Sequence, residues 1–319
     1  MCTRPPTLQY RPSAWESAWR SRHAFSVEED QSRNWARGCA LMHREPETIR
    51  KWLEFAKLRR PTRAMSTPPI PLAETKQALS FHAVLDGCTG ETRSLIPIEP
   101  LVGFLRHPEA HCHLMRFPRS SPWPFVASKA YLLPTWQTEV WPLGRASTFL
   151  FDLGASLYNK GLGGASTKWF VDEYRMRGIQ FDRVYAWEAT TYTDEEIYAA
   201  MPAPMVARMV YYNVPVDATV GAKHNPWRTL RTVATPRDFV IVKIDIDNST
   251  VEEPLIEQLL ADRTLAGLVD ELYFEHHVLH TPMWGYGWHL KTETNQTLVH
   301  SYDLFGRLRE MGIRAHSWV

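Results

Sequence analysis

The stretch from Thr148 to Lys168 limits the choice of fold more than any other. It opens with the apolar run Phe149–Phe151, which is typical of a strand buried on both faces. The run leads to Gly154, a second glycine cluster follows at 161–164, and residues 165–177 have the pattern of a helix. Glycine lets a backbone approach a ligand closely, and a helix N-terminus carries partial positive charge. A strand, a glycine-bearing turn and a helix therefore indicate the opening unit of a nucleotide-binding α/β fold.

The glycine spacing leaves a simpler alternative open. It is not GxGxxG, and the order Ser166-Thr167-Lys168 differs from the Gly-Lys-Ser/Thr of a phosphate-binding loop. A structural turn that binds no ligand is the competing interpretation. The order of the strands downstream favours a binding site.

From residue 148 onward, apolar runs alternate with helical patterns. Strands are predicted at 149–153, 183–187, 207–212, 239–244, 271–274 and 313–318, and helices at 165–177, 194–200, 251–260 and 302–311. Thr193 and Glu196 form a capping box at the start of the second helix. This alternation predicts an α/β fold with a doubly wound, mostly parallel, Rossmann-like sheet.

The predicted domains follow from the linkers. Residues 1–65 form an N-terminal extension, rich in Arg, Trp and Ser, with one predicted helix at 46–58; the pattern leaves open whether it is folded or disordered. A proline-rich linker then begins an accessory or cap segment, 66–147. Residues 148–319 form the Rossmann-like domain. We expect this domain to fold without the first 64 residues.

Charge and hydropathy exclude several classes of partner. The 36 Lys and Arg residues balance 35 Asp and Glu residues, and the net charge of +1 gives no electrostatic reason to expect nucleic acid or an anionic membrane. No apolar run reaches the roughly 18 residues of a membrane span. A small molecule is the expected partner, and the 13 tryptophans suit a pocket for one. The sequence does not indicate an oligomeric state.

The four cysteines are widely spaced and form no CxxC pair: Cys2, Cys39, Cys88 and Cys112. They predict neither a disulfide framework nor a zinc knuckle, so a reducing compartment, the cytoplasm, is expected. An Arg- and Ser-rich start leaves an organelle transit peptide as an alternative.

A histidine-rich stretch carries residue types that ligate metals. It contains His107, His111, Cys112 and His113, but Pro108 interrupts the ligand spacing. Surface or packing roles are the preferred interpretation, and no metal is predicted.

Taken in order, the strand ends resemble the FkbM-like family of S-adenosylmethionine-dependent methyltransferases. FDLGAS at 151–156 resembles the first cofactor motif and VYAWEA at 184–189 the second. VKIDIDNSTVEEPLIEQL at 242–259 and ELYFEHH at 271–277 resemble the blocks at strands four and five. The resemblance covers roughly 148–319, and it departs from the family in a longer loop at 156–164. It implies a methyltransferase with S-adenosylmethionine as cofactor and a sugar or small-metabolite hydroxyl as acceptor.

The resemblance implies cofactor contacts at the ends of the first three strands. The residues concerned are Asp152, Gly154, Ala155, Glu188, Asn213 and Asp217. Glu188 stands where a carboxylate accepts ribose hydroxyls in nucleotide-binding folds, and capping of the next helix is its alternative role. Asp152 is expected either to contact the amino-acid end of the cofactor or to hold the turn.

Catalytic candidates follow strands four and five: Asp245, Asp247, His276 and His277. Ligands of open α/β sheets bind at the carboxyl ends of the strands, and a hydroxyl acceptor benefits from a base. Packing roles for the histidines, and a divalent metal held by the two aspartates and a histidine, remain alternatives. The loop 278–297, with Trp284, Tyr286 and Trp288, is expected to cover the acceptor.

Two other functions compete with methyl transfer. One is a non-catalytic binding or scaffold protein that has kept the fold. The other is a nicotinamide-dependent oxidoreductase, which the missing GxGxxG spacing disfavours.

Overall fold

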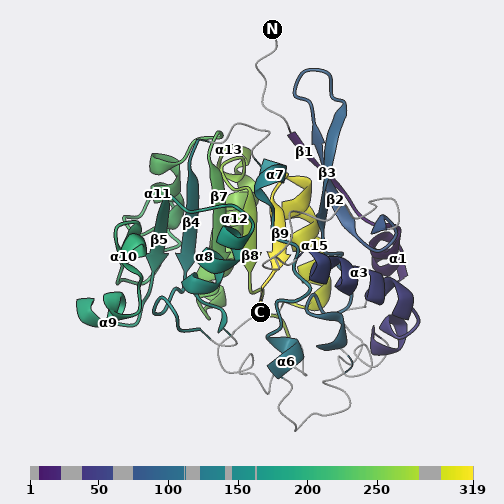
Figure 1. Cartoon of the computed structure of the whole chain (residues 1–319), viewed down its shortest axis with the longest axis horizontal. Coiled ribbons are helices and arrows are strands. Elements are labelled where there is room, and N and C mark those ends of the chain that lie inside the picture. Colours follow the sequence, from purple (N-terminus) through teal and green to yellow (C-terminus); the bar gives the residue numbers. More distant parts are fainter. Residues whose placement is uncertain are drawn as a thin grey trace. The chain divides into compact units, whose positions relative to one another are not determined.

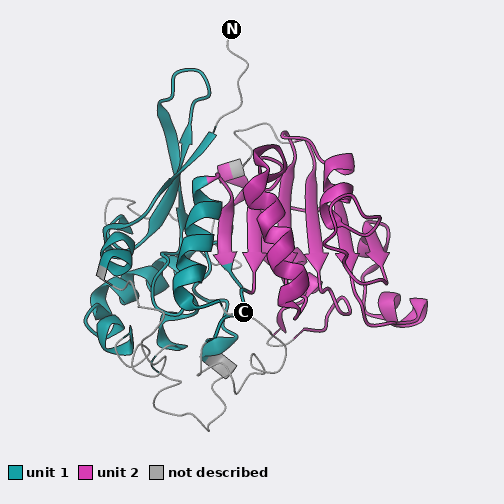
Figure 2. Ribbon diagram, turned by 180° about the vertical axis from the view of Figure 1, so that it is seen from behind, with its two compact units in different colours: residues 1–134, 276–310, 317–319 teal, residues 135–275, 311–316 magenta. Residues whose placement is uncertain are grey.

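The computed structural model describes residues 7–22, 38–59, 75–110, 112, 123–140, 146–161, 164–279 and 296–318. The chain divides into two compact units (Figure 2). Unit 1 contains residues 1–134, 276–310 and 317–319, and unit 2 contains residues 135–275 and 311–316. The chain leaves unit 1 after residue 134 and returns to it at residue 276.

Unit 2 is built on a six-stranded parallel sheet (Figure 1). In chain order its strands are β4 (Thr148–Leu153), β5 (Arg183–Trp187), β6 (Met209–Tyr212), β7 (Phe239–Ile244), β8 (Glu271–Phe274) and β9 (Arg314–Ser317). In space the order is β6-β5-β4-β7-β8-β9. The predicted α/β fold is thus confirmed, and each predicted strand end lies within two residues of an observed one.

The central strands are apolar on both faces, which explains why the sheet forms. Every residue of β4 and β7 is buried. Phe151 on β4 lies opposite Tyr185 on β5 and Val242 on β7, and its ring stacks on that of Tyr185 at 5.0 Å between centroids. Such cross-strand pairs fix the register of the parallel strands.

Helices connect the strands of unit 2. They are α7 (Gln137–Val140), α8 (Thr167–Met176), α9 (Asp194–Ala199), α10 (Ala203–Val206), α11 (Pro226–Val233), α12 (Ser249–Ala261) and α13 (Arg263–Ala266). Tyr174 on α8 donates a hydrogen bond to Glu271 at 2.6 Å, so α8 covers the face that carries Glu271. The predicted capping box of Thr193 and Glu196 is present at α9.

The strand order creates a switch point between β4 and β7. From β4 the chain continues to β5 on one side, and from β7 it continues to β8 on the other. Right-handed crossovers therefore place α8 and α12 on opposite faces of the sheet. The carboxyl ends of β4 and β7 border the crevice where open α/β sheets bind ligands.

Unit 1 contains an antiparallel sheet that the sequence does not predict. Its strands, in the order β1-β2-β3, are β1 (Thr7–Arg11), β2 (Ser80–Leu85) and β3 (Thr92–Ile98). The helices of unit 1 are α1 (Ala14–Arg22), α3 (Pro46–Leu58), α6 (Trp123–Val126) and α15 (Leu298–Glu310). The bounds of α3 match the prediction, and β1 brings part of the predicted N-terminal extension into the sheet.

Helix α15 joins this sheet through a buried cation. Arg309 is fully buried and donates to the carbonyl oxygen of Glu99 at 2.9 Å, while its other nitrogen lies 3.3 Å from the Glu99 carboxylate. Trp19 on α1 donates to Tyr302 on α15 at 3.1 Å. Chain segments almost 300 residues apart thus share one core.

The prediction that the cysteines form no disulfide was wrong. Cys39 and Cys112 are bonded to each other, and Cys88 is also disulfide-bonded. The first bond could not be predicted from the sequence, because the fold brings together residues separated by 73 positions. Over the part of the chain that the structure describes, no helix is long and apolar enough to cross a membrane.

Candidate functional site

The turn after β4 is closed by backbone contacts. Gly154 has a φ of +80°, a left-handed conformation that glycine adopts without strain. The N–H groups of Gly154 and Ala155 both donate to the carbonyl oxygen of Trp187 at 3.0 Å. A Cβ atom on Gly154 would lie 1.8 Å from the carbonyl oxygen of Asp245. This glycine is therefore required for the close approach of the backbones that follow β4 and β7.

Asp152 lies beneath this turn, and each of its carboxylate oxygens has a close polar neighbour. It accepts a hydrogen bond from Thr167 at 2.6 Å and pairs with Lys243 at 3.1 Å. Lys243 also donates to the carbonyl oxygen of Gly154 at 2.7 Å. Of the two predicted roles for Asp152, these contacts favour support of the turn over contact with a cofactor.

Lys243 is a buried cation that serves two carboxylates. Its side chain is 1% exposed and lies 3.1 Å from Asp152 and 3.5 Å from Asp245. Burial alone would lower the pKa of the ammonium group, but these two carboxylates raise the pKa above its ordinary value. Lys243 therefore stays charged near neutral pH.

Asp245 lies near a cation that it shares with a second carboxylate. Its side chain is 19% exposed, and Lys243 is shared with Asp152. Burial raises the pKa of Asp245 to about 7. Lys243 opposes this shift, and three neighbouring acids reinforce it: Glu275, Asp247 and Glu252. A carboxyl group with such a pKa accepts and releases protons near neutral pH.

Glu188 follows β5, as predicted, and anchors two loops. Its carboxylate accepts the backbone N–H groups of Ser156 and Thr190, each at 2.7 Å. Helix α9 is capped by Thr193, so Glu188 is not its cap. Each carboxylate oxygen has two acceptor positions, so both oxygens can accept a further hydrogen bond from a ligand hydroxyl.

Asn213 lies beside Glu188, whereas Asp217 forms a local turn. The Asn213 amide donates to the carbonyl oxygens of Glu188 at 3.1 Å and of Thr190 at 2.6 Å. Asp217 is exposed and accepts the N–H group of Thr219, a bond that lowers the pKa of Asp217. Among the described residues, no hydrogen bond or ion pair joins Asp217 to the other predicted cofactor residues.

Two residues at the carboxyl edge hold strained backbone. Ser156, after β4, has a φ of +51°, and Asp247, after β7, has a φ of +60°. Non-glycine residues seldom adopt this left-handed conformation, and such strain is concentrated at functional sites. Both outliers in unit 2 lie at the edge that carries Glu188 and Asp245.

Acids at this edge could serve as cation ligands. Carboxylate oxygens of Asp247 and Glu275 lie within 4.8 Å of each other. Oxygen donors suit hard divalent cations such as Mg²⁺. Acidic clusters of this kind also occur without a cation, and the metal alternative stays a prediction.

His276 and His277 belong to unit 1 and are 6% and 2% exposed. The Nδ1 atom of His276 lies 2.8 Å from the hydroxyl oxygen of Ser301 on α15. Burial lowers the pKa of His276 to about 3, and three neighbouring basic side chains add to the shift: His277, His300 and Arg106. His276 is therefore neutral and a weak proton acceptor near pH 7, which suits packing better than general-base catalysis.

Sequence reasoning found most of this edge but missed two residues. Lys243 stands alone within the apolar run 239–244, and that isolated charge was the available signal. Tyr211, which donates to the carbonyl oxygen of Ser156 at 2.6 Å, had no such signal. The aromatic residues of the predicted acceptor loop, Trp284, Tyr286 and Trp288, lie outside the described residues.

Comparisons with known proteins gave no match: no family model matches this chain, and neither the curated proteins nor the solved structures gave a match.

Proposed function

We propose that this chain is an S-adenosylmethionine-dependent methyltransferase that acts on a hydroxyl group of a sugar or small metabolite. The observation that carries the proposal is the convergence of the Gly154 turn, Glu188 and Asp245 at the carboxyl edge of the sheet. They lie beside the switch point, where open α/β sheets bind ligands. The resemblance of the four strand-end motifs to the FkbM-like family supports the same activity.

Cofactor binding is assigned to the ends of β4, β5 and β6. Glu188 would accept the ribose hydroxyls through its remaining acceptor positions, with Asn213 holding the loop beside it. The turn at Gly154 and Ala155 would border the methionine end. Asp152 and Lys243 would keep that turn in place through the contact to the Gly154 carbonyl oxygen.

Methyl transfer needs alignment and a proton acceptor. The acceptor oxygen displaces the sulfonium sulfur at the methyl carbon, and its proton moves to a base. A pKa of about 7 suits Asp245 for this task. Replacement of Asp245 by Asn should leave cofactor affinity nearly unchanged and lower turnover by roughly 10²-fold or more. Unchanged turnover would remove Asp245 from the proton transfer.

The first test is calorimetric titration of the full chain with S-adenosylhomocysteine. Binding is expected, and Glu188→Ala should weaken it by about 1–3 kcal/mol, because two hydroxyl donors lose a charged acceptor. Glu195→Ala, an exposed acid on α9, is the matched control and should bind as the parent does. No heat of binding to the folded parent would reject the cofactor assignment.

One observation favours a second candidate, a nicotinamide-dependent oxidoreductase. The all-parallel order β6-β5-β4-β7-β8-β9 is that of dinucleotide-binding sheets. A parallel titration with NAD⁺ distinguishes the two. Binding of S-adenosylhomocysteine without release of homocysteine from any of a panel of hydroxyl acceptors would favour a non-catalytic binding protein.

The predicted cytoplasmic location also remains a proposal. A disulfide that persists in the cell favours an oxidising compartment instead. Fractionation combined with thiol labelling of Cys39 and Cys112 separates these outcomes.

A further inference from the structure

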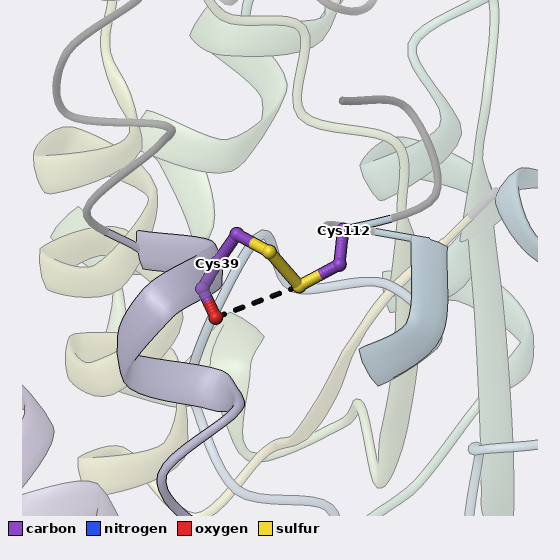
Figure 3. The surroundings of a disulfide bond; sticks show 2 residues. All are labelled: Cys39 and Cys112. Atoms are coloured by element: carbon purple, nitrogen blue, oxygen red, sulfur yellow. Dashed lines mark hydrogen bonds between the residues drawn. A yellow bond between two sulfur atoms is a disulfide. The ribbon is translucent and has the colours of Figure 1, made fainter. Parts of the chain in front are cut away.

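Unit 1 contains a cluster of two cysteines and one histidine, whereas the carboxyl edge of the sheet in unit 2 carries carboxylates. Cys39 lies in a helical turn at 38–42, and the N–H group of His43 donates to the Cys39 carbonyl oxygen at 3.0 Å. Residues four apart lie on the same side of a helix. Cys112 is joined to Cys39 by the disulfide, with 5.1 Å between their Cα atoms (Figure 3).

The three side chains are close enough to share one metal ion. The two sulfur atoms and a ring nitrogen of His43 all lie within 4.8 Å of one another. Two thiolates and an imidazole are the donors that zinc and related divalent metals prefer. Cys39 and Cys112 are 8% and 9% exposed, whereas His43 is exposed, so an ion held here would sit near the surface.

A cavity of about 700 Å³ borders this cluster. His43 and Cys112 line it together with apolar side chains of α3 and α6, among them Ile49, Leu53 and Phe125. A site with three protein ligands keeps one coordination position for water or a small ligand. The cavity gives such a ligand access to the two lining donors.

We propose that Cys39, His43 and Cys112 form a redox-controlled site for one divalent cation of the zinc class. In the oxidised chain the two sulfurs bind each other and cannot act as thiolate ligands. In the reduced chain they bind the cation together with His43. This proposal does not depend on the methyltransferase assignment.

The switch is a two-electron step that needs a dithiol reductant. The reductant passes two electrons and two protons to the Cys39–Cys112 bond, which breaks to give two thiols, while the reductant itself becomes a disulfide. The cation then displaces the two thiol protons and binds the thiolates. Oxidation by a disulfide reverses the sequence and releases the cation.

The test uses the full chain and Co²⁺ as a spectroscopic probe of zinc sites. One sample is kept oxidised, and the other is reduced with a phosphine and desalted without oxygen. The reduced chain should bind one Co²⁺, with thiolate-to-cobalt charge-transfer absorption that added Zn²⁺ abolishes. The oxidised chain should give no such absorption. Equal behaviour of the two samples would overturn the proposal.

Variants then assign the ligands. Cys39→Ser and Cys112→Ser should each abolish the absorption in the reduced chain. Replacement of the exposed His43 by Ala should weaken Co²⁺ binding by at least about tenfold, since even the partners that orient ligands contribute that much. Cys88→Ser is the matched control and should bind as the parent does.

Circular dichroism of each variant shows whether it is folded. His43 is exposed, so His43→Ala keeps the test decisive even where a cysteine variant fails to fold. Full affinity in folded His43→Ala, or charge-transfer absorption that survives Cys112→Ser, would contradict the assigned ligand set. Loss of the absorption in Cys88→Ser would place the ion at a different cysteine.

Discussion

Glu271 lies on β8 and Asp245 follows the neighbouring strand β7 of the same parallel sheet. The groups around these two carboxylates nevertheless differ in charge. Glu271 begins β8 and is fully buried. It accepts hydrogen bonds or ion pairs from four residues: Thr135, Tyr174, Arg314 and His316. Asp245 follows β7 and lies 3.5 Å from Lys243, which it shares with Asp152.

The pKa values record this difference. Burial alone would raise the pKa of Glu271, but Arg314, His316 and Tyr174 lower it to about 2. Burial raises the pKa of Asp245 to about 7, because Lys243 does not offset the neighbouring acids. A buried acid among donors and cations stabilises the fold, whereas one whose pKa is raised to near neutrality is available for proton transfer. The comparison separates a structural end of the sheet from a candidate functional end.

The largest expected effect is loss of the Glu271 charge. Glu271→Gln leaves Arg314 without its buried counter-ion and should reduce the free energy of unfolding by about 3–5 kcal/mol. Urea unfolding followed by circular dichroism measures the change. Asp172→Asn, which removes exposed ion pairs to Lys168 and Arg175, is the control and should cost less than about 1 kcal/mol. If Glu271→Gln lowered the free energy of unfolding no more than the control does, the Glu271 cluster would add nothing to stability.

Acid titration of the parent chain should remove about 3 kcal/mol of the free energy of unfolding. The pKa of Glu271 is depressed in the folded state, so its stabilisation is present above its ordinary pKa of 4.5 and is lost as pH falls towards about 2. The difference in unfolding free energy between the parent and Glu271→Gln should therefore shrink across this window. A difference that stays constant from pH 5 to pH 2.5 would contradict the low pKa.

The smallest expected effect concerns Asp245, whose pKa is raised, whereas that of Glu271 is lowered. Its folded-state pKa of about 7 exceeds its ordinary value of 3.8, so the folded chain keeps a proton that the unfolded chain has lost. Stability should fall as pH rises between about 4 and 7. Asp245→Asn should remove this slope and gain about 2–3 kcal/mol at pH 8 relative to pH 5. Glu195→Gln, which changes an exposed acid on α9, is the control and should keep the slope. A parent whose stability does not change over this range would remove the argument for Asp245 as a base.

The strands of unit 2 could be predicted because each is an apolar run followed by polar or glycine residues. The carboxyl ends of parallel strands share one edge, so the sequence also indicated that Glu188 and Asp245 would lie on it. It could not indicate that Asp152 and Lys243 would pair. That contact depends on the register between β4 and β7, in which these two residues are direct partners.

Unit 1 was harder to predict for the same physical reason. β1 pairs with β2 across about 70 residues, with Tyr10 opposite His82, and no local pattern encodes such a pairing. The Cys39–Cys112 contact is likewise set by the fold. Helix α3, whose signals are local, was predicted with its observed bounds.

The route of the chain through unit 1 has a consequence for synthesis on the ribosome. Glu16 and Glu99 are buried acids of unit 1, and Arg309, the cation beside both, is made about 200 residues after Glu99. Most of unit 2, residues 135–275, is made in between. A nascent chain therefore carries two acids of an unfinished core, still hydrated, while a parallel sheet forms downstream of them. Synthesis of α15, which carries Arg309, is the step that allows unit 1 to close.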